Sequence, residues 1–123
     1  MRRGPSTRIF DEKQRLAQDG KGRHIRRVSY LRPGRLIPKT AGGLRARTVQ
    51  LKPGERMARH STGHREELLI MVDGSLRVEA ESPTRTRRLT VTRGEAVFLP
   101  KRTPHAIINA SQARAIYLYV TGT

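Results

Sequence analysis

The sequence predicts an all-β protein whose short strands form an antiparallel sandwich or barrel. Apolar stretches recur from residue 28 to the end of the chain, separated by Gly, Pro and an Asp-Gly pair. Eight or nine short strands at this spacing are typical of that class. After residue 20 no stretch has helical periodicity, and no internal repeat is present. With 123 residues, we expect one domain with one core.

The composition narrows the class of protein further. Only 35% of the residues are hydrophobic and none is Trp, so the core should be thin and mostly aliphatic. The absence of Cys excludes disulfides, thiolate metal ligands and cysteine nucleophiles. No run approaches the roughly 20 apolar residues of a transmembrane helix, and the basic N-terminus lacks the apolar region of a secretory signal. We therefore expect a cytoplasmic protein without a membrane partner.

The chain is strongly basic. It has 26 Lys and Arg residues against 10 Asp and Glu residues, which gives a formal net charge of +16. Such a balance favours contact with RNA or DNA, because each neutralised phosphate releases a counterion. The alternative is a compositional preference for arginine, since 21 of the 26 basic residues are Arg and arginine also keeps a surface soluble. The charge alone leaves both interpretations open.

Residues 1–27 are interpreted as a basic N-terminal arm, followed by a β-barrel domain over residues 28–123. A short helix is expected at residues 11–19, because acidic residues begin this stretch and Gly20 ends it. If the protein binds nucleic acid or another polyanion, the arm supplies the candidate contacts. These are Arg2, Arg3, Arg8, Arg23, Arg26 and Arg27.

The strands of the barrel domain follow in order, each ended by a turn signal. Asp73-Gly74 is the strongest of these signals, because Asp-Gly favours a two-residue hairpin. The segment after it alternates apolar and charged residues, as a half-buried strand does. The expected strands are 28–31, 44–51, 68–72, 75–80, 89–92, 96–99, 105–108 and 113–120.

Three side chains in this region form a candidate metal site. His60 and the residue at position 62 share a strand face at about 7 Å, but position 62 is Thr, a poor ligand. Glu67 offers a carboxylate, and His105 lies on a later strand that could face the same cavity. Two histidines and one carboxylate with open positions suit Fe(II), Mn(II), Ni(II) or Zn(II). His64 would join them only if the chain bends at Gly63, because a straight strand separates His64 from His60 by about 13 Å.

Two ordered motifs span residues 54–109. The first has the pattern Gly-x5-His-x-His-x3–4-Glu-x6-Gly. It matches at Gly54, His60, Glu67 and Gly74, with Thr62 in place of the second His. The second has the pattern Gly-x5-Pro-x-Gly-x2-His-x3-Asn. It matches at Gly94, Pro100, His105 and Asn109, with Arg102 in place of the middle Gly. Through these motifs the chain resembles the cupin superfamily of RmlC-like jelly-roll barrels.

The resemblance implies a jelly-roll fold with His60, Glu67 and His105 as ligands of a divalent transition metal. Thr62 leaves one ligand position of the family unfilled, which His64, a water or a substrate atom could take. The alternative is a barrel that kept its architecture and lost its ion. The resemblance also implies a homodimer, formed through residues 28–37. Two ordered motifs are specific for the fold and much less so for activity.

Three further residues are candidates for binding a substrate. Arg102, near the barrel mouth, could hold a carboxylate or phosphate bidentately. Tyr117 and Tyr119 share a strand face and could place a phenol in the cavity. Exposed arginine and ordinary packing are the alternatives for these residues.

Three functions are therefore compatible with the sequence. The first is a metal-binding cupin that acts on a small, anionic molecule by dioxygenation, isomerisation, decarboxylation or lyase chemistry. The second is a non-catalytic sensor that binds such a molecule. The third is a basic accessory protein that binds RNA or DNA through the arm. Whether the protein is an enzyme is left open by the sequence.

Overall fold

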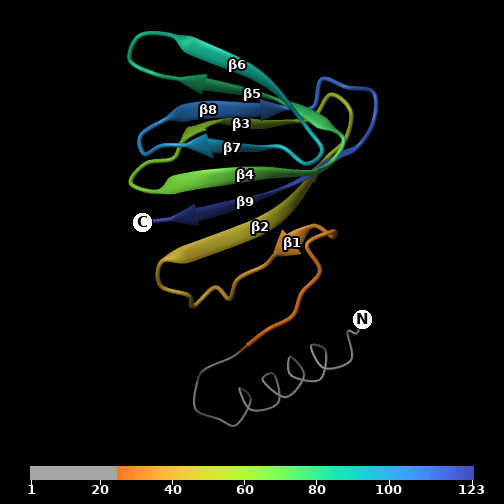
Figure 1. Cartoon of the computed structure of the whole chain (residues 1–123), viewed down its shortest axis with the longest axis vertical. Coiled ribbons are helices and arrows are strands. Elements are labelled where there is room, and N and C mark those ends of the chain that lie inside the picture. Colours follow the sequence, from red (N-terminus) through yellow and green to blue (C-terminus); the bar gives the residue numbers. More distant parts are fainter. Residues whose placement is uncertain (1–24) are drawn as a thin grey trace.

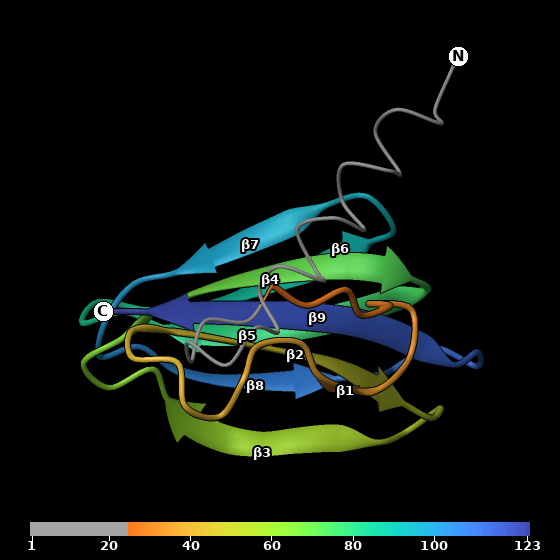
Figure 2. The same ribbon diagram turned by 90° about the horizontal axis from the view of Figure 1, so that it is seen from below.

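In the computed structural model, which describes residues 25–123, nine strands form two antiparallel sheets that face each other as a jelly-roll barrel (Figure 1). The five-stranded sheet has the order β1-β2-β9-β4-β7, and the four-stranded sheet has the order β3-β8-β5-β6 (Figure 2). The expected helix over residues 11–19 and four of the six candidate arginines of the arm lie outside the described residues. The described part contains no helix that could cross a membrane. The strands are β1 (Gly34–Arg35), β2 (Leu44–Leu51), β3 (Arg56–Ser61), β4 (Glu66–Asp73), β5 (Ser75–Glu81), β6 (Thr86–Thr92), β7 (Ala96–Leu99), β8 (Pro104–Ile108) and β9 (Ala115–Gly122).

The predicted all-β class and the strand count are confirmed, but the prediction of a strand over residues 28–31 was wrong. That segment has no regular structure until a turn at residues 30–31, and its apolar side chains are exposed. It lacks a ladder with β2, which pairs on this side only with the two residues of β1. Pro33 precedes β1 and has no N–H to donate, which limits the pairing. A single side-chain bond, from Thr48 Oγ1 to the Tyr30 carbonyl (2.9 Å), joins the segment to the barrel.

The interior of the barrel changes from apolar at one end to polar at the other. Across β2, β9 and β4, inward residues lie in register in successive rows: Val49–Tyr117–Met71, then Arg47–Tyr119–Leu69, then Arg45–Thr121–Glu67. The apolar end is filled by side chains from both sheets. This core cluster contains Leu51, Leu69, Met71, Leu76, Val78, Val91, Ile107, Ala115 and Tyr117.

The motif residue Asn109 closes the apolar end of the barrel. It is fully buried, and its amide nitrogen donates to the carbonyl oxygens of Leu51 (3.0 Å) and Ala113 (2.8 Å). Its amide oxygen accepts a hydrogen bond from the backbone N–H of Ser111 at 3.0 Å. A buried amide with its donors and its acceptor satisfied fixes the loop between β8 and β9. Asn109 therefore has a structural role, and the polar end is left for chemistry.

Candidate metal centre and cavity

A β-bulge in β3 brings His60 opposite His105. Met57 pairs with Ile107, and the next aligned pair is His60 with His105, so three steps along β3 match two along β8. In a regular strand, residues three apart point to opposite faces. The bulge reverses this parity, and Met57 and His60 both line the cavity. The two imidazole rings lie 4.4 Å apart between centroids, tilted by 59°.

His105 is fully buried and presents an unpartnered nitrogen. Its Nδ1 lies 2.9 Å from the Thr103 carbonyl oxygen, which can only accept, so Nδ1 carries the hydrogen in the neutral ring. Nε2 then holds a free lone pair, and it is the one buried side-chain nitrogen or oxygen in residues 25–123 without a hydrogen-bond partner. Burial lowers the pKa of His105, which favours the neutral form that a metal requires.

Glu67 faces the two histidines from the opposite sheet. One of its carboxylate oxygens, Oε2, lies 3.9 Å from Nε2 of His105. Burial raises the pKa of Glu67, and the nearby His60 opposes this shift. A buried carboxylate without a hydrogen-bonded cation is costly. A divalent ion between the three side chains would remove that cost and give the His105 nitrogen a partner.

The structure brings the three predicted ligands together. One ligand atom from each of His60, Glu67 and His105 lies within 4.8 Å of the others. His60 is oriented like His105, because its Nδ1 lies 2.9 Å from the Ala58 carbonyl oxygen, so its Nε2 is also the free nitrogen. Backbone carbonyls that fix the ring orientation are typical supports of metal-binding histidines. The donor set therefore fits a divalent transition metal.

Thr62 uses its hydroxyl to join two loops. Its Oγ1 donates to the Pro100 carbonyl (2.6 Å) and accepts from the Thr103 N–H (3.0 Å). The backbone N–H of Thr62 also donates to the Thr103 carbonyl, at 3.2 Å. The hydroxyl at this motif position thus connects the β3–β4 turn to the β7–β8 loop, which leads into the strand that carries His105.

We expect Thr62→Val to lower the free energy of unfolding by about 1–3 kcal/mol. The substitution keeps the shape of the side chain but removes both hydroxyl bonds, and it leaves the N–H of the buried Thr103 unpaired. Thr62→Ser keeps the hydroxyl and is the matched control, with a loss under about 1 kcal/mol. Urea denaturation of both variants measures the difference. Equal stabilities would contradict the role assigned to the hydroxyl.

Two sequence candidates lie away from this cluster. His64 is exposed in the β3–β4 turn and is not part of the group of converging ligand atoms. Arg102 is exposed in the β7–β8 loop, outside the set of residues that line the cavity. Its backbone has a φ of 54°, a left-handed conformation that explains why glycine is usual at this motif position. Their roles as metal ligand and substrate contact stay predictions from the sequence.

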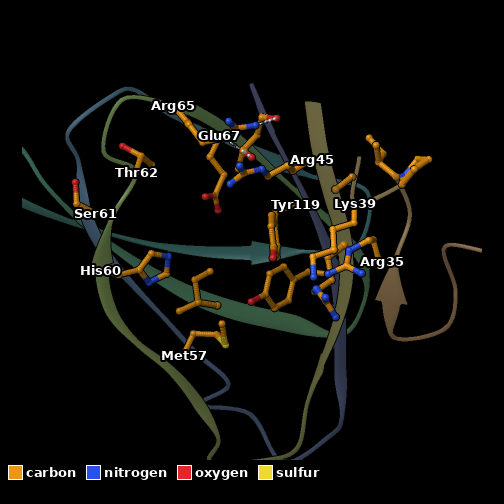
Figure 3. Close-up of a pocket in the computed structure, with 17 residues that line it drawn as sticks. Arg35, Lys39, Arg45, Met57, His60, Ser61, Thr62, Arg65, Glu67 and Tyr119 are labelled. Atoms are coloured by element: carbon orange, nitrogen blue, oxygen red, sulfur yellow. Dashed lines mark hydrogen bonds between the residues drawn. The ribbon is translucent and has the colours of Figure 1, made fainter. Parts of the chain in front are cut away.

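The polar end of the barrel is hollow. A cavity of about 560 Å³ opens beside the three ligands, within the 300–1,000 Å³ typical of small-molecule sites. Tyr117 and Tyr119 line it, together with Met57 and Ile107, and their role in binding a substrate stays a prediction. Burial raises the pKa of Tyr117, so its phenol stays protonated. Figure 3 shows Glu67 and His60 pointing into this space, with Tyr119 between them and the β1–β2 side.

The opposite wall is basic, and sequence reasoning missed it. Among the residues that line the cavity, Glu67 is the one acid, and five are cations. Arg65 belongs to the scaffold, because its guanidinium donates to the Gly43 carbonyl (2.9 Å) and to both oxygens of Thr121 (3.0 and 3.1 Å). The other four cations come from β1, β2 and the segment between these strands. They are Arg35, Lys39, Arg45 and Arg47.

Comparison with known proteins shows which family the chain belongs to. A family model described as Cupin domain matches residues 47–121, more than half of the chain. The chain belongs to the cupin family. The sequence resemblance is thereby confirmed, and the barrel with two His and one Glu at its polar end is a cupin barrel. No protein of curated function matches the sequence significantly.

Solved cupin structures share the fold at low sequence identity. A Cupin 2 conserved barrel domain protein from Salinispora arenicola has a TM-score of 0.64 and 18% identity, covering 84% of this chain and 91% of its own. The Cnp3 cupin domain of Schizosaccharomyces pombe has a TM-score of 0.65 and 13% identity, covering 74% and 59%. A variant of oxalate decarboxylase from B. subtilis has a TM-score of 0.64 and 22% identity, covering 77% and 28%. This chain therefore spans less than two thirds of the length of the last two, and the likeness concerns the fold alone.

Proposed function

We propose that this cupin holds a divalent transition metal with His60, Glu67 and His105 and binds a small anionic molecule in the adjoining cavity. The observation that carries the proposal is the unpartnered Nε2 of His105, fully buried and 3.9 Å from the Glu67 carboxylate. Such a nitrogen is rare without a ligand. The basic lining supports an anionic partner, because five cations and one acid surround the cavity.

The residues around the ion have distinct tasks in this proposal. The Ala58 and Thr103 carbonyls orient the two imidazoles, and Glu67 supplies the negative charge that offsets part of the charge of the ion. A bound ion would polarise an oxygen atom of the ligand. The exposed side of His60 and the absence of a ligand side chain at Thr62 leave room for that atom. Fe, Mn, Ni and Zn all accept this donor set.

The metal content of the purified protein tests the proposal. After incubation with Fe(II), Mn(II), Ni(II) or Zn(II) and removal of excess ion, we expect elemental mass spectrometry to find near one ion per chain for at least one metal. We expect His105→Ala to lose it, and His64→Ala, which removes an exposed imidazole outside the cluster, to keep it. Circular dichroism verifies that each variant is folded. A wild-type protein that retains no ion would overturn the proposal.

A non-catalytic sensor would use the same metal site and cavity as an enzyme, and it would differ only in leaving its ligand unchanged. Its ligand would be recovered unchanged from a metal-loaded protein, whereas an enzyme would convert it. We propose the shared part, metal and anion binding, as the function.

The remaining partners rest on weaker support. Of the arm arginines expected to bind RNA or DNA, Arg26 and Arg27 are within the described residues and exposed. The expected homodimer involves residues 28–37, where Val28, Tyr30 and Leu31 are exposed by 42–59%. Exposed apolar side chains are compatible with a subunit contact, so both partners stay predictions.

A further inference from the structure

Three arginines of the cavity wall stand next to one another on one face of the sheet. Arg35 of β1 and Arg47 of β2 are directly opposite each other in the antiparallel ladder, and Arg45 lies two residues from Arg47 on the same strand. All three line the cavity. Residues opposite each other in a ladder have Cβ atoms about 5 Å apart, and like charges in that position are destabilising.

No acidic side chain compensates this arginine cluster (Arg35, Arg45 and Arg47). In the described part of the chain, none of the three takes part in an ion pair or a side-chain hydrogen bond. By contrast, on the other sheet Arg59, Arg77 and Arg88 are all within 4 Å of Glu79. The arginine cluster therefore differs from this second group, whose positive charge Glu79 partly offsets. An unpaired, mutually repelling arginine cluster in a cavity is a site for an anion.

The register fixes where the arginine cluster lies relative to the metal centre. Arg45 and Glu67 both pair with Thr121 of β9, from its two sides. Two strand spacings of about 4.8 Å therefore separate their backbones by roughly 10 Å. Figure 3 shows Arg35 and Lys39 on one side of the cavity with His60 across from them, while Arg45 and Glu67 are both drawn at its upper edge. Between the two sides the wall carries Met57, Ile107 and the phenols of Tyr117 and Tyr119.

We infer that the ligand is a small organic dianion that spans the cavity, one oxyanion on the metal centre and the other on the arginine cluster. The spacer between its two groups is short and largely apolar, because it passes Met57, Ile107 and the tyrosine rings. Carboxylate and phosphate share the geometry that a guanidinium recognises, so either group fits the arginine end. The inference rests on the proposed metal function for one end of the ligand only.

The first test uses thermal unfolding of the ligand-free protein at low ionic strength. We expect Arg47→Gln to raise the midpoint by about 2–5 °C, because it removes the like-charge pair with Arg35. Arg87→Gln makes the same charge change at an exposed position of β6 outside the cavity and is expected to leave the midpoint within about 1 °C. Equal shifts in the two variants would contradict a repelling cluster in the cavity.

The second test measures anion binding by isothermal titration at constant ionic strength, with the metal-loaded protein. Glutarate is expected to bind at least about 10-fold more tightly than butyrate, because only glutarate has a second carboxylate for the arginine cluster. We expect Arg47→Gln to weaken glutarate by about 10–100-fold and Arg87→Gln to leave it unchanged. With 3-phosphonopropionate, tighter or weaker binding than glutarate tells whether the arginine end prefers a phosphate-like or a carboxylate group.

The outcomes separate this inference from the proposed function. A protein that holds metal but binds glutarate and butyrate equally, or loses glutarate equally in both variants, would overturn the dianion and leave the metal site intact. Binding of 3-phosphonopropionate that depends on Arg47 in a protein without metal would support the arginine subsite while the metal function failed.

Discussion

Gly74→Ala is expected to lower the free energy of unfolding by roughly 2–5 kcal/mol. Gly74 lies between β4 and β5 with a φ of +80°, and a Cβ added there would meet the Arg114 carbonyl oxygen at 2.7 Å and the Cα of Ala115 at 3.1 Å. Both obstacles are backbone atoms, and Ala115 is fully buried in the core. The side chain would therefore have to displace the start of β9 as well as strain its own residue.

Gly54→Ala is the matched control for this prediction. Gly54 opens the same motif with a φ of +84°, yet a Cβ there would meet nothing within 4 Å. Only the backbone strain applies, so we expect a loss of about 1–2 kcal/mol. Chemical denaturation of the two variants separates strain from steric conflict. If both lost the same amount, the contact with β9 would not be what requires glycine at position 74.

The succession of strands and the three candidate metal ligands could be proposed from the sequence because each rests on a local pattern. Turn residues separate the strands from Leu44 onward, and the ranges that were predicted there agree with the observed ones to within a few residues, as for β2 (Leu44–Leu51). No range was predicted for β3 (Arg56–Ser61). The segment 28–31 failed because apolar residues alone do not make a strand: a strand also needs an edge to pair with, and β2 is paired there only by two residues. Such pairing is decided by the tertiary structure.

The face of β3 on which His60 lies could not be predicted from the local sequence either, because it too depends on the tertiary structure. Its position opposite His105 depends on the bulge between Met57 and His60, and no turn residue within β3 marks that bulge. The sequence instead suggested a bend at Gly63, which lies in the β3–β4 turn with a φ of +63°. A bend there leaves His64 exposed.

The sequence does contain a signal for the arginine cluster, which the sequence analysis did not use. In β2, Val49 and Leu51 face the core, and the period of two places Arg45 and Arg47 on that same inward face. Charged residues that continue the apolar face of a strand indicate a polar cavity beyond the core. Recognising this cavity from the sequence required knowing which face of β2 points inward. The sequence does not decide this, because the other face of β2 (Leu44, Ala46 and Thr48) is just as apolar.

Glu67→Gln is expected to change metal affinity and stability in opposite directions. If Glu67 is a ligand as proposed, its loss should weaken binding of the ion by at least about 100-fold, since even residues that only support ligands account for 10–100-fold. In the metal-free protein the same substitution should raise the free energy of unfolding at neutral pH. Burial raises the pKa of Glu67 above its ordinary 4.5, so folding favours the protonated form, and ionisation at higher pH costs stability.

The direction of the pKa shift determines how the stability difference between Glu67→Gln and the wild type changes with pH. Below the ordinary pKa of 4.5, Glu67 is protonated in both the folded and the unfolded chain, so Glu67→Gln and the wild type have similar free energies of unfolding. As pH rises through the raised folded pKa, the wild type loses stability and the variant does not. The difference in free energy of unfolding therefore grows and then levels off. The lowered pKa of His105 makes the folded chain lose stability as pH falls below about 6.5, but it does so in both proteins and largely cancels in their difference.

Glu66→Gln removes an equal charge from an exposed neighbour and should show no such rise. Denaturant titrations of the three metal-free proteins from pH 4 to 8 measure the gap. A gap that shrank with pH would mean that the Glu67 carboxylate is stabilised in the folded protein without an ion, and the case for a metal at this centre would lose its electrostatic argument.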